Sequence, residues 1–466
     1  MIRFLIILTI FSLLSPKLPC AANAQEEITS FDRILIIAPH PDDEILAAGG
    51  VIQKAITKKA TVKVVYITNG KHNLLSLFLR HKLLLKDKEN VIELGKVRKK
   101  ESIEACKILG LNENNLIFLG YPDSGILKIF LNHWGNQKPF KDSLSQLTYT
   151  EQEEGISFYA SYKGENILKD LETVILNTNP TKVFIPSPYD TNEDHIGSYL
   201  FSRMALLSLE DIVPAEIYLY IVHRWYFSIF ERHSYKTYTN LPQKMNAPNN
   251  SKILKLSQQE KSKKEKAILK FRTQMYCKKF LLSFVQDEIF NKELPPATLN
   301  NKQPITRNIK ERNNTIARII LSLENNLLKG EIIFTKRMDT KDIKGEIYLF
   351  GYKRNIRFGE MPKTYLSFRK DRWNIYNQDK KMVKTENISF NINGNNRILF
   401  KVPIALLDDP NFIFVSMDIS LSHQDIYLPW ELIRIHKNPF KQQNNCLLYT
   451  SPSPRDLSTS SMPSSA

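Results

Sequence analysis

A histidine and three acidic residues stand almost side by side in the stretch "APHPDDEILAAGG", residues 38–50. They are His40, Asp42, Asp43 and Glu44, placed between an apolar run and the expected start of a helix. Carboxylates in a first helical turn are stabilised by the helix dipole and by unpaired backbone N–H groups, so helix capping accounts for one or two of them. Capping does not account for the histidine, and imidazole nitrogen with carboxylate oxygen is an ordinary set of zinc ligands.

A second cluster of the same kind lies far along the chain, in "PSPYDTNEDHIGSYL". There Asp190 and Asp194 follow an apolar run, and His195 opens a helical pattern. Three protein ligands drawn from the two clusters would leave one position of a tetrahedral zinc open for water, as catalytic zinc requires. The spacing alone leaves two interpretations open, a metal site and independent helix capping at both places.

Short runs rich in β-branched residues predict the strands that must position these clusters. The runs are "RILIIA" (33–38), "TVKVVYIT" (61–68), "NLIFLG" (115–120), "KVFIP" (182–186) and "EIYLYIV" (216–222). Helical patterns lie between several of them, for example "VRKKESIEACKILG", which ends at a glycine. Near-continuous apolar strands alternating with helices predict an α/β fold with a mostly parallel sheet and helices on both faces. Ligands of such sheets bind beyond the carboxyl ends of the strands, where both clusters fall.

A series of motifs supports a more specific interpretation. In order they are "APHPDDE", "TNG" (68–70), "VRKKES" (97–102), "LGYPDSG" (119–125) and "DTNEDH" (190–195), and together they resemble the PIG-L/LmbE-like zinc-dependent N-acetylglucosaminyl deacetylases. The resemblance covers roughly 32–293, where "KAILKFRTQ" and "QDEIF" look like the closing helices of the family. It implies a Rossmann-like fold and removal of an acetyl group from N-acetylglucosamine carried on a larger molecule.

The resemblance also implies a role for each motif residue. His40, Asp43 and His195 would bind one Zn²⁺ per chain, and Asp42 would be the general base. The chemistry fits that division, because a bound zinc polarises an amide carbonyl and lowers the pKa of its water from about 15.7 towards about 7. Asp42 would then take the proton from that water and return it to the leaving amine. Glu44 is expected to face the helix N-terminus in a structural role.

The residues expected around the zinc include one departure from the family pattern. Arg98 and Asp123 match the sugar-contacting residues of the family, with an ordinary ion pair as the alternative for each. Asp194 is expected to fix which imidazole nitrogen of a ligand faces the metal. Asn192 stands where many members have a histidine that stabilises the oxyanion, and an amide can donate only a neutral hydrogen bond there. His223 is a further candidate for holding the oxyanion.

The two ends of the chain are expected to lie outside the folded protein. Residues 1–24 combine a basic start, an apolar core too short to span a bilayer and a small-x-small site, which predicts a signal peptide and export to the periplasm or the extracellular space of a bacterium. Residues 446–466 are rich in Ser and Pro, resemble translated adapter sequence and are expected not to be native. The interval 25–297 is expected to form the deacetylase domain.

The remainder of the chain predicts a second domain of a different class. A Pro- and Asn-rich linker is expected over 298–312, followed by a smaller all-β, sandwich-like domain over 313–440, because short strand-like runs alternate there with turn residues. Aromatic side chains in it, such as Trp373 and Trp430, are expected in the core, with stacking on sugars as the alternative.

The overall charge is +17, from 65 Lys plus Arg against 48 Asp plus Glu. This charge indicates anionic partners or simply the composition bias of an Ile-, Lys- and Asn-rich chain. A basic helix over 252–279 is expected to pack on the domain, with contact to a membrane surface or envelope polymer as the alternative.

The sequence therefore predicts an exported zinc-dependent hydrolase that removes the N-acetyl group from an N-acetylglucosamine-type amino sugar or glycoconjugate. The alternative is a catalytically weak or inactive glycan-binding envelope protein, for which Asn192 is the motivating feature. No nucleic-acid-binding module is present in the sequence, so nucleic acid is not an expected partner. The sequence leaves open the oligomeric state and whether Cys106 and Cys277 form a disulfide.

Overall fold

A computed structural model describes most of the chain between residues 27 and 436. The described residues are 27–73, 88–151, 156–223, 251–301, 303–310, 316–335, 343–354, 356–370, 372–384, 386–394, 396–421 and 424–436. The expected signal peptide (1–24) and the expected non-native tail (446–466) lie outside them. No helix within the described ranges is long and apolar enough to cross a membrane.

The first part of the chain is built on a sheet of seven strands, and the expected α/β fold is confirmed. The order in the sheet is β3-β2-β1-β4-β5-β7-β6. The first five of these pair in parallel, whereas β7 pairs in antiparallel fashion with both β5 and β6, so the sheet is mixed. The strands are β1 (Arg33–Ala38), β2 (Thr61–Thr68), β3 (Leu116–Tyr121), β4 (Lys182–Pro186), β5 (Glu216–Tyr220), β6 (Ser251–Leu254) and β7 (Glu288–Lys292).

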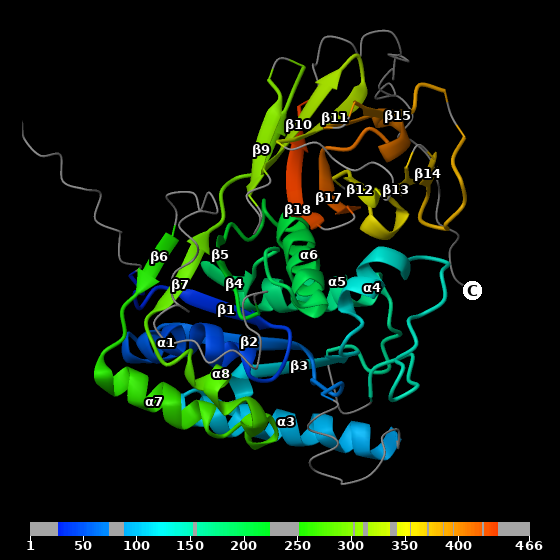
Figure 1. The fold of residues 1–466 in the computed structure, drawn as a ribbon. Coiled ribbons are helices and arrows are strands. Elements are labelled where there is room, and N and C mark those ends of the chain that lie inside the picture. The colour runs from blue at the N-terminus through cyan, green and yellow to red at the C-terminus, as the bar shows by residue number, and fades with distance from the viewer. Residues whose placement is uncertain are drawn as a thin grey trace, which may run out of the picture.

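Helices cover both faces of this sheet (Figure 1). One face carries α1 (Asp43–Thr57), α3 (Lys88–Leu109), α7 (Gln258–Ile268) and α8 (Lys278–Leu282), and the other carries α4 (Ile126–Asn132), α5 (Gly164–Thr178) and α6 (Glu193–Ser208). The strands supply both cores because alternate side chains point to opposite faces. In β1, Leu35 and Ile37 belong to one core, while Ile34, Ile36 and Ala38 belong to the other.

The basic segment 252–279 is not the single helix that the sequence predicted. It forms β6, then α7, then a 3₁₀ helix over Arg272–Cys277 and the start of α8. A capping box starts α7, in which the Ser257 hydroxyl accepts from the Glu260 N–H and the Glu260 carboxylate accepts from the Ser257 N–H. Lys264 in this helix is fully buried, so the basic face is not entirely solvated. "QDEIF", compared above with a helix, ends in β7.

The second part of the chain is a sandwich of two sheets, as the strand-like runs predicted. One sheet has the order β15-β16-β11-β10-β9 and the other β14-β13-β12-β17-β18-β8. Side chains of both sheets share one core. The strands are β8 (Ala297–Leu299), β9 (Ile305–Lys310), β10 (Ile316–Glu324), β11 (Leu327–Phe334), β12 (Lys344–Tyr352), β13 (Lys363–Arg369), β14 (Arg372–Tyr376), β15 (Ser389–Asn393), β16 (Arg397–Pro403), β17 (Phe412–Leu421) and β18 (Gln424–Ile435).

The two parts of the chain are joined by a continuous apolar core. The outer face of the six-stranded sheet packs on helices α4 and α6, below it in Figure 1. The Phe130 ring of α4 lies 5.4 Å from the Phe358 ring and 6.2 Å from the Trp430 ring, measured between centroids. Trp430 is 4% exposed and is therefore a core residue, as expected. The segment 298–312, expected to be a linker, contributes to β8 and contains β9.

Candidate metal centre

The residues of the two sequence clusters meet at the carboxyl edge of the seven-stranded sheet. His40 follows β1, and His195 lies in the first turn of α6 after β4. β1 and β4 are neighbours in the sheet, although the chain passes through β2 and β3 between them. Asp123 follows β3 and His223 follows β5, so four parallel strands deliver polar side chains to the same edge. This is the point where the strand order reverses, the usual place for a ligand in such sheets.

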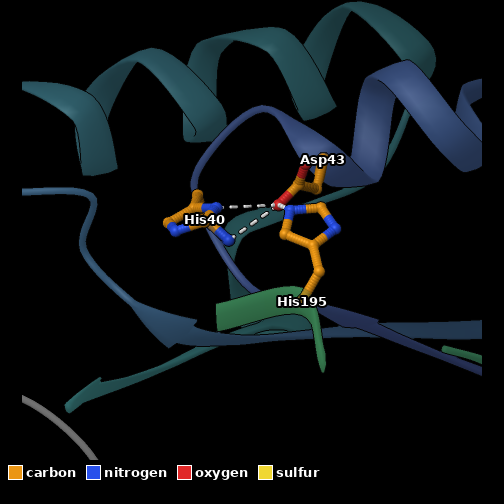
Figure 2. Close-up of side chains that lie close together, drawn as sticks. All are labelled: His40, Asp43 and His195. Atoms are coloured by element: carbon orange, nitrogen blue, oxygen red, sulfur yellow. Dashed lines mark hydrogen bonds and ion pairs between the residues drawn. The ribbon is translucent and has the colours of Figure 1, made fainter. Parts of the chain in front are cut away.

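His40, Asp43 and His195 form a compact buried group (Figure 2). The Asp43 Oδ2 atom lies 3.3 Å from His40 Nδ1 and 3.1 Å from His195 Nε2. It also accepts a hydrogen bond from the His40 backbone N–H at 2.9 Å. One potential ligand atom from each residue lies within 4.8 Å of the others. The structure therefore brings together the three residues proposed as ligands.

A carboxylate stands behind each imidazole. The far nitrogen of His40, Nε2, lies 3.2 Å from Asp194 Oδ2 and 3.5 Å from Asp123 Oδ1. The far nitrogen of His195, Nδ1, lies 3.1 Å from Asp190 Oδ2. A carboxylate that accepts from one ring nitrogen leaves the lone pair of the other nitrogen for a metal. The arrangement directs His40 Nδ1 and His195 Nε2 towards Asp43.

A second triplet, His40, Asp123 and Asp194, also has the spacing of a metal site. Its carboxylates already accept backbone hydrogen bonds, Asp123 from His72 N at 2.8 Å and Asp194 from Ser124 N at 2.5 Å. Asp43 also accepts one backbone hydrogen bond, from His40 N at Oδ2, but its Oδ1 atom is buried and has no hydrogen-bond partner among the described residues. Two nitrogens and one oxygen with an unused carboxylate oxygen fit Zn²⁺ better than the second triplet does.

The electrostatics of the group favour a positive charge at its centre. Burial disfavours the imidazolium form, but Asp190 and Asp43 outweigh it and raise the pKa of His195 to about 10. The pKa of His40 is likewise raised well above its usual value despite burial, because Asp123, Asp194 and Asp43 contact the ring. Burial opposes ionisation of Asp43, yet both histidines hold its pKa well below the usual range. A metal cation bound here would take the place of those protons.

Asp42 lies beside the group in a strained conformation. Its φ is +145°, a region that residues with a side chain rarely adopt and that costs about 1–3 kcal/mol. The Asp42 N–H donates to Glu44 Oε2 at 3.0 Å, and Arg98 Nη2 donates to Asp42 Oδ2 at 3.2 Å. Burial raises the pKa of Asp42 to about 7, with Arg98 opposing that shift. Strain that the surroundings maintain is typical of functional positions.

Arg98 is buried and is held by the backbone of two site loops. Its Nη1 donates to Gly70 O at 2.8 Å and its Nη2 to Pro41 O at 2.9 Å, in addition to the contact with Asp42. Gly70 has a φ of +63°, and a Cβ atom there would lie 2.0 Å from Arg98 Nη1, so the "TNG" motif requires glycine. Both candidate sugar-contacting residues, Arg98 and Asp123, therefore contact other site residues.

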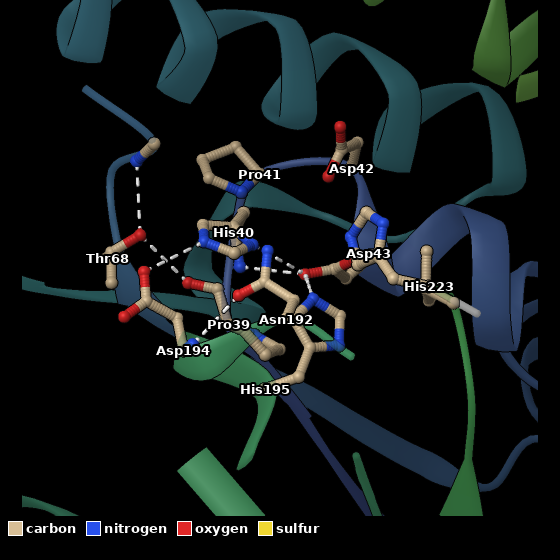
Figure 3. A network of polar contacts seen from close by, with 12 residues as sticks. Pro39, His40, Pro41, Asp42, Asp43, Thr68, Asn192, Asp194, His195 and His223 are labelled. Atoms are coloured by element: carbon tan, nitrogen blue, oxygen red, sulfur yellow. Dashed lines mark hydrogen bonds and ion pairs between the residues drawn. The ribbon is translucent and has the colours of Figure 1, made fainter. Parts of the chain in front are cut away.

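Asn192 caps the helix that carries His195 (Figure 3). Its side-chain oxygen accepts from the Asp194 N–H at 2.8 Å, so only the Nδ2 end can donate to another group. His223 is nearby, with its ring centroid 4.8 Å from that of His195. Burial and the neighbouring His195 lower the pKa of His223 to about 4, which keeps this imidazole neutral near pH 7.

Asp190 belongs to the second sequence cluster, and the sequence alone assigns it no role. It is buried, contacts His195 Nδ1, and accepts from Val222 N at 3.0 Å and Asn192 N at 3.0 Å. Asp194, the neighbour of His195 in the chain, instead contacts His40. A sequence signal for Asp190 exists in its position in the loop after β4, four residues beyond Pro186, because loops at the carboxyl ends of parallel strands line such sites.

Comparison with known proteins identifies the domain. Residues 35–206 match the family model described as PIG-L: GlcNAc-PI de-N-acetylase. A curated relative, the 1D-myo-inositol 2-acetamido-2-deoxy-alpha-D-glucopyranoside deacetylase of Thermomonospora curvata, is 37% identical over 100 residues, which are 20% of this chain and 32% of the relative. The chain thus spans about a third of the length of that relative.

Several solved structures resemble this one at low identity. A conserved protein of Thermus thermophilus is 20% identical with a TM-score of 0.36 over 58% of this chain and 98% of that one. The N,N'-diacetylchitobiose deacetylase of Pyrococcus horikoshii is also 20% identical with a TM-score of 0.36, over 56% of this chain and 83% of that one. These likenesses are too low to assign a reaction. The match over residues 35–206, in the order of motifs seen in the sequence, shows that this chain carries a domain of the PIG-L family.

Proposed function

We propose that this chain is a zinc-dependent hydrolase that removes the N-acetyl group from an amino sugar of the N-acetylglucosamine type. The observation that carries the proposal is the convergence of His40 Nδ1, His195 Nε2 and the Asp43 carboxylate, with a further carboxylate behind each ring. The family match and the name of the curated relative supply the reaction class.

His40, Asp43 and His195 would hold the zinc. When bound, the metal supplies a Lewis acid that polarises the amide carbonyl and acidifies water. The protein contributes the direction of the ligands, since Asp194 and Asp190 fix the ring nitrogens that face away from the centre. Both carboxylates lie in the protein interior, since Asp190 and Asp194 are each 2% exposed.

Asp42 would act as the general base. Its backbone is fixed by Glu44, and its carboxylate is paired with Arg98, which opposes the effect of burial on its pKa. A base with a pKa near the working pH transfers protons most effectively in both directions, from the attacking water and to the leaving amine. Arg98 in this arrangement positions the base, and its proposed contact with the sugar would have to coexist with that ion pair.

The developing negative charge on the carbonyl oxygen needs a donor. The two candidates are the Asn192 amide, through Nδ2, and the neutral ring of His223. Preorganised donors of this kind are effective because they are already oriented before the charge appears. Asp123, buried near His40, is the candidate for a sugar hydroxyl, through whichever lone pairs its contacts with His72 and His40 leave.

Export to the periplasm or the extracellular space is part of the proposal and rests on the sequence of residues 1–24 alone. Contact of the segment 252–279 with an anionic envelope polymer or membrane surface also stays a proposal. It is supported by the exposed lysines of α7 and weakened by the burial of Lys264 in the same helix.

The test combines metal content with acetate release. Protein purified without chelator should hold about one zinc per chain and release acetate from N-acetylated amino sugars. His40→Ala and His195→Ala should lose the metal, because each removes one of three ligands. His133→Ala is the matched control, since its ring contacts the Lys138 carbonyl and Phe140 and lies outside both ligand triplets.

The outcomes separate the two candidate functions. Zinc lost from both ligand variants but kept by the His133 control, together with acetate release by the parent protein, supports the deacetylase. Zinc bound without acetate release from any sugar in the panel would favour the glycan-binding alternative. Unchanged metal content in both ligand variants would refute the proposed centre.

A further inference from the structure

Helix α1, which begins at the candidate ligand Asp43, is broken after its first turn. Ala48 has φ −133° and ψ 20°, outside the helical region, although the helix continues to Thr57. In a regular helix the Gly50 N–H would donate to the Leu46 carbonyl four residues earlier. Sharp breaks of this kind have an identifiable cause, such as a side chain inserted between the donor and the acceptor.

The inserted group is a buried ion pair from two distant elements. Glu288, at the start of β7, accepts from Gly50 N at 2.6 Å and from Val51 N at 3.1 Å. Lys264 of α7 donates to the Leu46 carbonyl at 2.9 Å and to Glu288 Oε1 at 2.6 Å. The carboxylate thus binds the donor that begins the second segment of α1, and the ammonium binds the acceptor that ends the first segment.

The local sequence is adapted to this insertion. A Cβ atom at Gly50 would lie 2.9 Å from Glu288 Oε2 and 2.4 Å from a Leu256 methyl group, so a side chain there would push the carboxylate away. A Cβ atom at Gly49 would lie 3.4 Å from Lys264 Cγ. That distance is ordinary van der Waals contact, so it is Gly50 in "LAAGG" that leaves the space through which the Glu288 carboxylate reaches the helix.

We infer that the Lys264–Glu288 pair is a positioning device for the metal centre, an inference that rests on the proposed function. The pair sets the direction of the first segment of α1, and that segment carries Asp43. The Asp43 Oδ2 atom must stay near both His40 Nδ1 and His195 Nε2, at 3.3 Å and 3.1 Å in the structure. If the helix closed into a regular ladder, the first turn would change direction and the carboxylate would move away from the rings.

The test is a double variant that removes the insertion without leaving an unpaired buried charge. Lys264→Met/Glu288→Leu allows the Gly50 N–H to bond back to the Leu46 carbonyl, and replacing a buried ion pair by apolar residues is often neutral for stability or stabilising. The expected result is a melting temperature close to that of the parent protein with zinc affinity about 10–100-fold weaker, measured with Zn²⁺ against a chromophoric chelator.

A second ion pair on the same elements is the matched control. Lys261 and Asp287 lie 2.9 Å apart, one turn and one residue away from the inserted pair, with side chains 28% and 37% exposed. Lys261→Met/Asp287→Leu should leave the zinc affinity unchanged. Equal loss in both double variants, or unchanged affinity in a folded Lys264→Met/Glu288→Leu, overturns the inference.

A single substitution covers the case in which the double variant does not fold. Glu288→Gln keeps the size of the side chain but leaves only one acceptor oxygen for three donors, the Gly50 N–H, the Val51 N–H and the Lys264 ammonium. Hydrogen exchange of the Gly50 and Val51 amides should therefore accelerate about tenfold, and zinc affinity should fall. The exchange is measured on metal-free protein and does not depend on deacetylation. Faster exchange with unchanged zinc affinity overturns the inference, whereas a parent protein that binds zinc but releases no acetate overturns only the proposed function.

Discussion

Replacing Asp190 by Asn tests the least expected feature of the metal centre. Asp190 is 2% exposed and contacts His195 Nδ1 at 3.1 Å. It also accepts from the backbone N–H groups of Asn192, Val222 and His223, at 3.0, 3.0 and 3.1 Å. Asn has nearly the same size, but its nitrogen is a donor and must face either the His195 ring or one of these N–H groups.

The magnitude of the effect follows from these contacts. A substituted partner behind a metal-binding histidine typically weakens metal affinity 10–100-fold, which is about 1.4–2.7 kcal/mol. A buried N–H group that loses its acceptor costs a further 1–3 kcal/mol of folding stability, roughly. Asp190→Asn is therefore expected to weaken zinc binding and to lower the unfolding midpoint together.

Chelator competition and urea unfolding measure the two effects separately. The control is Asp142→Asn, because Asp142 is also 2% exposed, contacts a histidine (His72 Nε2) and accepts from Ser145 N at 3.0 Å. This control should lose stability and keep its zinc affinity, since His72 belongs to neither ligand triplet. Zinc affinity unchanged in Asp190→Asn, or weakened equally in both variants, would show that Asp190 does not orient a ligand.

Three further predictions concern the base, the oxyanion and a buried lysine. Asp42→Asn should keep zinc and lose most turnover, because an amide cannot accept the proton, whereas Asp43→Asn should lose zinc. Nearly full activity in Asp42→Asn would show that the base is another group. Asn192→His should raise turnover by roughly 10–1000-fold if the missing imidazole limits the reaction. The variant should also lose about 1 kcal/mol of folding stability, because the Asn192 side chain no longer caps the Asp194 N–H. Lower turnover with zinc retained would show that the site is built around the amide. Burial lowers the pKa of Lys363 to about 7, so between that pH and about 10.4 the unfolded chain binds one more proton than the folded chain, and the free energy of unfolding rises with pH. Lys363→Met should reduce the slope of this free energy against pH by up to about 1.4 kcal/mol per pH unit. Equal slopes for the variant and the parent protein, in urea titrations at pH 7 to 9, would contradict the prediction.

The elements of the fold follow closely from local sequence. Runs of β-branched residues predicted β1, β2 and β4 with their observed bounds, because strands buried on both faces have a continuous apolar pattern. The same logic found most strands of the sandwich, where alternate residues such as Leu349 and Phe350 face different cores. The basic segment 252–279 was the exception, because its charge content does not report the turns that divide it.

The residues that form the site could also be predicted from the sequence, but the contacts between them could not. Motif order brought His40, Asp43 and His195 into one hypothesis, since residues after adjacent strands must share an edge. Which carboxylate stands behind which ring was decided by the tertiary structure. Asp190 and Asp194 lie four residues apart, yet the loop before α6 turns one towards His195 and the other towards His40.

Long-range packing decided the remaining features. Nothing near "LAAGG" indicates that Glu288 and Lys264 enter the helix, because both come from elements more than 200 residues away. Nothing in the sandwich sequence indicates that Trp430 packs against Phe130, since an apolar strand residue has the same pattern whichever layer covers it. Local sequence was enough to place most strands and the chemical groups at the sheet edge. The partners of those groups came from the folded arrangement, because hydrogen bonds and side-chain packing depend on positions in space that local periodicity does not encode.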